Sequence, residues 1–171
     1  MLTEHPQFFT ATILEWKHLL KPDKYKDILV DSLSFLVTNN RVIVYGFVIM
    51  PNHLHILWQM QNGFKRSEVQ RDFLKYTAQQ IKFDLQKNHL KVLEKFKVTA
   101  RDRDHQFWEH RPLSVDLWTE KVFEQKLNYI HENPLKEKWK LAVVAEDYYY
   151  SSAKFYITGK DDFGFLTHYK S

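Results

Sequence analysis

The sequence predicts an α+β fold, a sandwich of the ferredoxin-like type in which helices pack on a central antiparallel sheet. Segments rich in β-forming residues alternate with segments whose apolar residues recur at helical spacing, in the order β-α-β-β-α-β-α. The two middle strand segments are separated only by a Pro-Asn pair, which suits a tight turn that returns the chain beside itself.

A single domain is expected over residues 1–171. Only 4 glycines and 5 prolines punctuate the chain, and no segment has the composition of a linker or a repeat. We expect the core to span about residues 8–156 and an aromatic tail to occupy residues 157–171.

The first half of the chain supplies three strands and one helix of this fold. A β-rich run from Phe8 to Leu14 predicts the first strand. Apolar residues recur at helical spacing over residues 23–38, and Pro22 with Asp23 suits the start of that helix. The almost wholly apolar residues 41–50 predict a central strand, and residues 53–60 predict its partner after the turn.

The second half supplies two helices and a short strand. Ser67 is the predicted N-cap of a helix that runs to about Gln86. Residues 88–104 are strongly basic and are expected to be irregular or partly helical, and residues 105–112 form a short strand-like segment. Thr119 caps the last helix, which ends at Asn133 because a proline follows.

Basic residues also lie off the apolar stripe of the first of these two helices. Arg71, Lys75, Lys82 and Lys87 either line a track for phosphates or form an ordinary solvated helix face.

Composition excludes several classes of site. The chain has no cysteine, so disulfide frameworks, thiolate metal sites and cysteine nucleophiles are excluded, and a reducing cytoplasm fits. No secretory signal and no apolar run of membrane-spanning length is found, so no membrane partner is expected. The net charge of +4 and an aromatic content of 16% suit a nucleic-acid partner as well as an ordinary aromatic core.

The pair His53 and His55 is the most informative feature of the chain. Alternate residues of a strand share a face, so both imidazoles project together, while Leu54 and Ile56 point into a core on the other side. Two imidazoles on one strand make half of a metal site. The alternative interpretation is a pair of ordinary, partly buried histidines.

The last helix offers a second half for such a site. Its apolar stripe is formed by Phe123, Leu127 and Ile130, and Tyr129 lies off that stripe. Asn133 follows four residues later, so it shares a face with Tyr129. A hydroxyl nucleophile and an amide oxygen one turn apart can both reach a metal on a facing strand. The alternative is a half-buried tyrosine that only packs.

Tyrosine with an ordinary pKa of ~10 is a weak nucleophile at neutral pH. A divalent cation beside a phosphodiester stabilises developing charge and aligns the attacking and leaving oxygens. The attack would leave a covalent phosphotyrosine ester, which conserves the energy needed for rejoining.

Three motifs in order resemble one family. They are Gly46-Phe47-Val48-Ile49-Met50-Pro51-Asn52-His53-Leu54-His55, Tyr129-Ile130-His131-Glu132-Asn133-Pro134 and Asp147-Tyr148-Tyr149-Tyr150-Ser151-Ser152-Ala153. Together they resemble the REP-associated tyrosine transposases, a branch of the single-tyrosine HUH transposases that is linked to repeated extragenic palindromes (REP) in bacteria. The resemblance spans roughly Phe8 to Tyr156.

The resemblance implies a metal-dependent enzyme that cleaves and joins single-stranded DNA beside a hairpin through a 5′-phosphotyrosine intermediate. It implies that His53 and His55 are metal ligands, that Tyr129 is the nucleophile and that Asn133 is the third metal ligand, where relatives often have Gln. It implies Mg²⁺ or Mn²⁺, although imidazole ligands by themselves favour Mn²⁺ or Zn²⁺. His131 is taken as structural or DNA-facing.

The resemblance also implies a bacterial, cytoplasmic and nucleoid-associated protein. It leaves a homodimer possible, because relatives differ in whether the tyrosine serves its own histidine pair or that of a partner.

A set of basic residues is expected to bind DNA phosphates or to form a solubilising loop. The set consists of Lys95, Lys97, Arg101, Arg103 and Arg111.

Two alternative functions also fit the residues: a DNA- or RNA-hairpin binding module that has lost catalysis, and a metallohydrolase that activates water.

Overall fold

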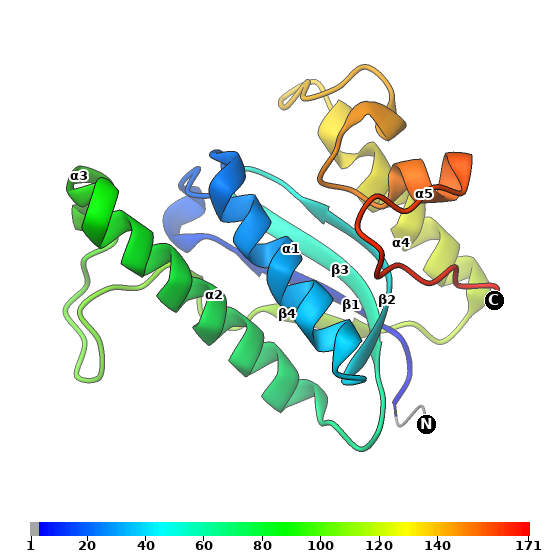
Figure 1. The fold of residues 1–171 in the computed structure, drawn as a ribbon, viewed down its shortest axis with the longest axis horizontal. Coiled ribbons are helices and arrows are strands. Elements are labelled where there is room, and N and C mark those ends of the chain that lie inside the picture. The colour runs from blue at the N-terminus through cyan, green and yellow to red at the C-terminus, as the bar shows by residue number, and fades with distance from the viewer. Residues whose placement is uncertain (1–3) are drawn as a thin grey trace.

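The computed structural model describes residues 4–171, and its strands form one antiparallel sheet in the order β2-β3-β1-β4 (Figure 1). The elements are β1 (Gln7–Thr12), α1 (Asp23–Thr38), β2 (Val42–Ile49), β3 (His53–Met60), α2 (Arg66–Asn88), α3 (Leu90–Glu94), β4 (Leu113–Asp116), α4 (Glu120–Glu132) and α5 (Ala153–Thr158). The order β1-α1-β2-β3-α2-β4 confirms the ferredoxin-like sandwich.

Helices cover both faces of this sheet (Figure 1). Helices α1 and α2 pack on one face, where their apolar residues share a core with alternate residues of the strands, among them Leu54, Ile56 and Trp58. Helix α4 packs on the other face against Val48 and Leu57. Because the central strand β3 is enclosed from both sides, all 8 of its residues are buried.

Close packing of α4 on β2 depends on Gly46. A Cβ atom at this position would lie 2.7 Å from Cδ1 of Leu127, closer than real carbon atoms approach. The pairing of β2 with β3 also shifts register between Val44 and Gly46. A residue without a side chain at this irregular point allows the helix to approach the strand closely.

Most predicted elements are confirmed. Helix α1 spans the predicted residues, and the hairpin of β2 and β3 turns at Pro51 and Asn52. Thr119 caps α4, where its side chain accepts a hydrogen bond of 3.1 Å from the backbone N–H of Val122.

The fourth strand lies further along the chain than predicted. Residues 105–112 make only isolated bridges, such as Ile13 with Trp108, and the strand is Leu113–Asp116. Arg111 has a φ of 59° and Pro112 has no N–H to donate, so the segment cannot form a continuous ladder.

The start of α2 also differs from the prediction. The helix begins at Arg66, and Lys65 is its N-cap residue, without a side-chain cap. Ser67 therefore lies within the first turn. The basic stretch 88–104 contains the short helix α3, which agrees with the expectation of partial helicity.

The C-terminal residues pack on the outer side of β2. Ser151 forms a bridge with Val48, and Leu166 forms a parallel bridge with Val44. Phe165 is buried in the core, and the ring of Tyr169 stacks on Phe123 of α4 at 4.9 Å. Within residues 4–171, no helix is long and apolar enough to cross a membrane.

Candidate active site

Strand β3 presents His53 and His55 on the face that α4 covers. Both side chains are buried, and their ring centroids lie 4.9 Å apart. The alternation of the strand places Leu54 and Ile56 in the core on the opposite face, as predicted. The two imidazoles therefore lie together between the sheet and α4.

Each imidazole is held through its Nδ1 atom. His53 Nδ1 lies 2.7 Å from Oδ1 of Asn52, and His55 Nδ1 lies 2.7 Å from Oγ1 of Thr10. Hydrogen bonds of this kind fix the orientation of metal-binding histidines and direct their Nε2 atoms toward the metal. Both Nε2 atoms are thus available on the side that faces α4.

The two Nε2 atoms meet different surroundings. Within residues 4–171, the buried Nε2 of His55 has no hydrogen-bond partner. Nε2 of His53 lies 3.2 Å from Oδ1 of Asn133. When Nδ1 of His53 donates to Asn52, Nε2 carries a lone pair, so it and the Asn133 oxygen are two acceptors directed at each other. A cation between them would satisfy both.

Burial keeps both imidazoles neutral. Desolvation lowers the pKa of His53 to about 4 and that of His55 to about 3. Nearby lysines, Lys136 for both rings, lower these pKa values further. A neutral imidazole is the form that binds a metal ion.

Helix α4 brings Tyr129 and Asn133 to the histidine pair. The ring of Tyr129 lies 5.6 Å from that of His55, and its side chain is 42% exposed. Asn133 is buried and follows the last residue of α4 at the start of a 3₁₀ turn, Asn133–Leu135. The two sequence-predicted partners therefore lie together, one open to solvent and the other enclosed.

These donors fit a divalent cation. Among the described residues 4–171, no group of three or more His, Cys, Asp and Glu side chains is placed to hold a metal. The available set is two imidazole nitrogens and the amide oxygen of Asn133, with solvent access beside Tyr129. Mixed nitrogen and oxygen donors suit Mn²⁺ well and Mg²⁺ less closely.

A buried hydrogen-bond cluster fastens α4 to the sheet. Oγ of Ser152 accepts a 3.0 Å bond from the backbone N–H of Phe47 on β2 and lies 2.7 Å from Nε2 of His131 on α4. The backbone N–H of Ser152 also donates to the Phe47 carbonyl at 3.0 Å. Burial lowers the pKa of His131 to about 4, so this imidazole is neutral. His131 is structural, on the side of α4 opposite to solvent.

Sequence reasoning missed the cations that surround the site. Nζ of Lys136 lies 4.3 Å from the ring centroid of Tyr129, and Nζ of Lys126 lies 5.0 Å from that of Phe8. The spacing of Lys126 and Tyr129, three residues apart on α4, is the signal that could have indicated a shared face. Trp16 was also missed; it is 61% exposed, and its ring lies 6.3 Å from that of His53.

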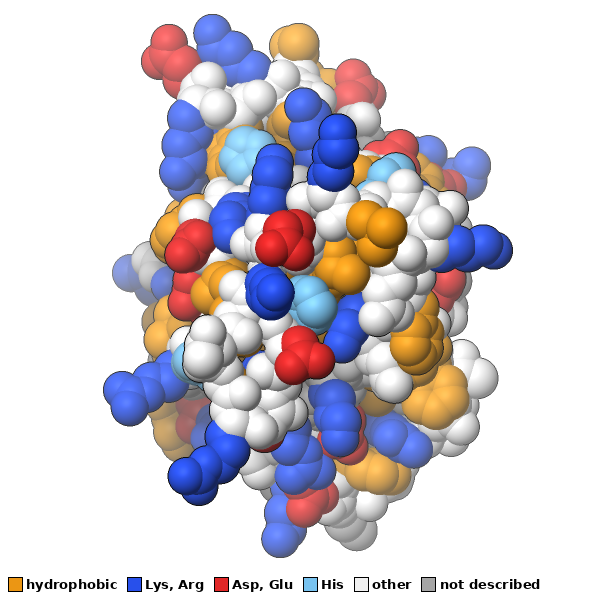
Figure 2. Space-filling view, turned by 90° about the vertical axis from the view of Figure 1, so that its left-hand side faces the viewer, with side chains coloured by type: hydrophobic (Ala, Val, Ile, Leu, Met, Phe, Trp, Pro, Cys, Tyr) orange, Lys and Arg blue, Asp and Glu red, His pale blue; other side chains and the backbone are white. Residues whose placement is uncertain are grey.

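The basic residues predicted to bind DNA divide into two groups. Arg103 and Arg111 line a groove beside α2, whereas Lys95, Lys97 and Arg101 do not line it. Figure 2 looks onto the end of the molecule that carries α3, and it shows Lys and Arg side chains projecting around this face.

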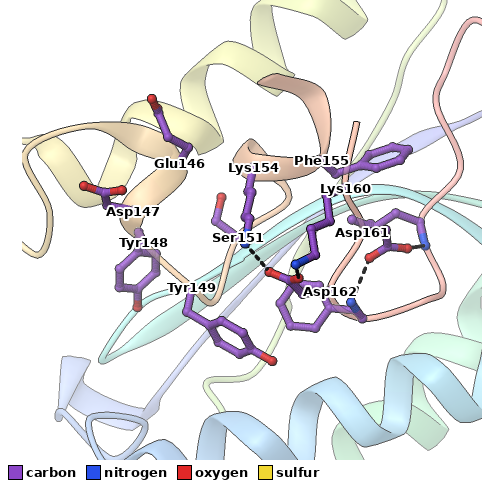
Figure 3. A pocket seen from close by; sticks show the side chains of 12 residues that line it. Glu146, Asp147, Tyr148, Tyr149, Ser151, Lys154, Phe155, Lys160, Asp161 and Asp162 are labelled. Atoms are coloured by element: carbon purple, nitrogen blue, oxygen red, sulfur yellow. Dashed lines mark hydrogen bonds and ion pairs between the residues drawn. The ribbon is translucent and has the colours of Figure 1, made fainter. Parts of the chain in front are cut away.

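A second, smaller pocket of about 220 Å³ lies among the C-terminal residues (Figure 3). Two of its carboxylates are engaged within the protein. Asp162 pairs with Lys154 at 2.9 Å and with Lys160 at 3.6 Å. Asp161 accepts from the backbone N–H groups of Phe163 and Leu166. These bonds hold the C-terminal tail together.

No protein-family model and no curated protein sequence matches this chain. Among solved structures, the chain is similar to a REP-associated tyrosine transposase bound to a REP hairpin, with 17% identity and a TM-score of 0.65. That match covers 98% of this chain and 88% of the other. A candidate transposase from Deinococcus radiodurans matches with 14% identity, a TM-score of 0.48 and coverage of 77% and 92%. The first of these two similarities shows that the chain has the fold of that REP-associated tyrosine transposase.

Proposed function

We propose that this protein is a metal-dependent tyrosine transposase, a single-strand DNA endonuclease and strand transferase that acts beside hairpins. One observation carries the proposal: the exposed Tyr129 lies beside two oriented imidazoles, with an amide oxygen 3.2 Å from one of them. The similar solved structure, a REP-associated tyrosine transposase bound to a REP hairpin, supports the same chemistry and a hairpin-bearing substrate.

The site residues would have distinct roles. His53, His55 and Asn133 would hold the divalent cation, and Asn52 and Thr10 would orient the two imidazoles. When bound, Mg²⁺ or Mn²⁺ supplies charge neutralisation and alignment at the scissile phosphate. A third ligand that is neutral leaves the bound cation its full charge toward the DNA.

Tyr129 would be the attacking group. Its phenolic oxygen loses a proton and forms a bond to phosphorus, while the bond from phosphorus to the 3′ oxygen of the preceding nucleotide breaks. The 3′ oxygen takes up a proton and leaves as a hydroxyl. The product is a 5′-phosphotyrosine ester, and attack by a 3′ hydroxyl reverses the step and rejoins DNA.

Two lysines would bind the phosphates that flank the reaction. Lys136 lies over the Tyr129 ring and Lys126 lies over Phe8, on the same side of α4 as the tyrosine. Cations in these places would attract a DNA strand across the exposed edge of the site. They would also balance the charge that develops on the phosphate.

The test is covalent capture on hairpin-bearing single strands. Labelled oligonucleotides are incubated with the protein and Mn²⁺ or Mg²⁺ and are then resolved on denaturing gels. The expected result is a protein–DNA adduct that requires the metal and is lost in Tyr129→Phe. Tyr156→Phe serves as a control, because that tyrosine donates to the Tyr45 carbonyl away from the histidine pair.

Two outcomes would contradict the proposal in favour of the alternatives. Cleavage that survives Tyr129→Phe would indicate a hydrolase that activates water at the metal. Tight hairpin binding without cleavage under either metal would indicate a binding module.

A further inference from the structure

A long groove lies outside the tyrosine site, between α2 and residues 102–112. Its volume is about 1090 Å³. Helix α2 forms one wall along most of its length, and the irregular segment that precedes β4 forms the other. Neither the histidine pair nor Tyr129 lines it.

The α2 wall presents hydrogen-bond donors in a row. The residues are Arg71, Lys75, Gln79, Lys82 and Gln86, at steps of four, four, three and four, which place them on one face of the helix. No carboxylate of α2 lines the groove. At 1.5 Å per residue the row is about 22 Å long, so it presents cations and amides along an extended path.

The opposite wall is neutral overall, because its two arginines are matched by two carboxylates. The arginines are Arg103 and Arg111, and the carboxylates are Asp102 and Glu109. Asp102 pairs with Arg103 at 2.9 Å, and Glu109 accepts from the backbone N–H of Glu15 at 2.7 Å. Across both walls, five Lys and Arg side chains face two carboxylates, so the lining has a formal net charge of +3, which comes from α2 and attracts anions.

The groove suits paired nucleic acid better than an unpaired strand. Unpaired bases bind by stacking on exposed aromatic rings, but Phe107 and Trp108 in this groove are only 4% and 7% exposed. Phe83 alone of these three lining rings is exposed, at 53%, so the groove offers one ring for stacking and not a row of them. The exposed aromatic side chains Trp16 and Tyr129 lie instead at the histidine site.

The sheet connects the groove to the tyrosine site. The backbone N–H of Glu109 donates to the Thr12 carbonyl, and Trp108 bridges to Ile13. The wall opposite α2 therefore adjoins β1. Thr12 pairs in turn with His53. Two inter-strand spacings, about 10 Å, therefore separate this wall from the histidine strand.

We propose that this groove holds the paired stem of a DNA hairpin through its phosphates, while the unpaired flank crosses the sheet edge to Tyr129. The proposal rests on the proposed function, and it assigns the two parts of the substrate to two surfaces with different chemistry. Phosphate contacts from the groove would set the register of the stem. The separation between the groove and the histidine strand would then determine how far from the stem the DNA is cleaved.

The experiment measures binding without cleavage. Fluorescence anisotropy with the full chain in EDTA compares a DNA hairpin that has single-stranded flanks with the flank alone, across a range of NaCl concentrations. The test variant is Lys75→Gln/Lys82→Gln. The matched control is Lys65→Gln/Lys87→Gln, which removes the same charge from the N-cap and the last turn of α2, at positions that do not line the groove.

We expect the test variant to bind the hairpin on the order of tenfold more weakly near 0.2 M salt, with a salt slope lower by about 2, because two phosphate contacts are lost. Its affinity for the flank alone and the behaviour of the control stay as in the wild type. Unchanged hairpin affinity, or equal losses for hairpin and flank, would overturn the proposal, and so would a preference for an RNA hairpin of the same sequence.

Failure of the proposed function gives a different result. In that case stem binding would still depend on Lys75 and Lys82, but Tyr129 would form no adduct. If the groove proposal alone fails, the adduct forms and hairpin binding is insensitive to these lysines.

Discussion

Replacing Ser152 with alanine removes the hydroxyl that fastens the tyrosine helix to the sheet. This oxygen accepts from the Phe47 N–H at 3.0 Å and lies 2.7 Å from His131 Nε2, and all three groups are buried. Alanine leaves both the N–H group and the imidazole without this partner. Leaving a buried polar group unsatisfied costs about 1–3 kcal/mol.

Two such groups predict a loss of about 2–6 kcal/mol in the free energy of unfolding for Ser152→Ala. At about 2–4 °C per kcal/mol for a chain of this size, the melting temperature should fall by roughly 4–24 °C. The rate of adduct formation should also fall, because α4 carries Tyr129 and Asn133 and would lose its position against β2.

The neighbouring serine provides a matched control. Oγ of Ser151 accepts one local bond, from the Ala153 N–H at 3.1 Å, and has no contact of this kind with α4. Ser151→Ala should cost about 1 kcal/mol and leave the adduct rate near that of the wild type. Urea unfolding and adduct assays at 20 °C measure both quantities. The reasoning is refuted if the two alanine variants lose equal stability, or if Ser152→Ala keeps the wild-type rate.

Two further substitutions test the packing and the orientation of the site. Gly46→Ala places a Cβ atom 2.7 Å from Leu127 Cδ1. Overpacking should lower the free energy of unfolding, measured in urea, by about 1–3 kcal/mol and should slow adduct formation. Wild-type stability would show that α4 does not pack closely on β2 at this point. Thr10→Val removes the hydroxyl that holds His55 Nδ1 at 2.7 Å and should weaken Mn²⁺ binding about 10–100-fold in calorimetry. Thr12→Val on the same strand face is its control, and equal affinities for the two variants would argue against an orienting role for Thr10.

Regular elements were predictable because their periodicities are local. Helical spacing over residues 23–38 gives α1, and the Pro-Asn turn followed by alternation gives the hairpin that carries the histidines. The shared face of His53 and His55 follows from strand geometry alone. These features need no knowledge of distant contacts.

The position of β4 was not predictable in this way. Aromatic residues favour strands, so residues 105–112 were expected to form one, but Phe107 and Trp108 anchor an irregular segment in the core. The actual edge strand carries Leu113 and Val115, which are 55% and 38% exposed and lie on a face that no helix covers fully. Tertiary packing decides between the two segments.

The arrangement of the site depends on similar long-range contacts. Helical spacing places Tyr129 and Asn133 on one face, but only the docking of α4 on β2 brings Asn133 Oδ1 to 3.2 Å from His53. That docking depends on Gly46 and Ser152, which lie far from each other in the sequence. The flanking Lys136 belongs to the turn after α4, whose path the sequence pattern does not define.

Mass spectrometry of the covalent adduct tests the central claim most directly. Trypsin cuts after Lys126 and Lys136, and the peptide between these sites contains one tyrosine, Tyr129. After cleavage of a hairpin-bearing strand with Mn²⁺ and nuclease digestion, we expect this peptide to carry a 5′-linked nucleotide on Tyr129. A nucleotide attached to any other residue, or cleaved DNA with no modified peptide, would contradict the account.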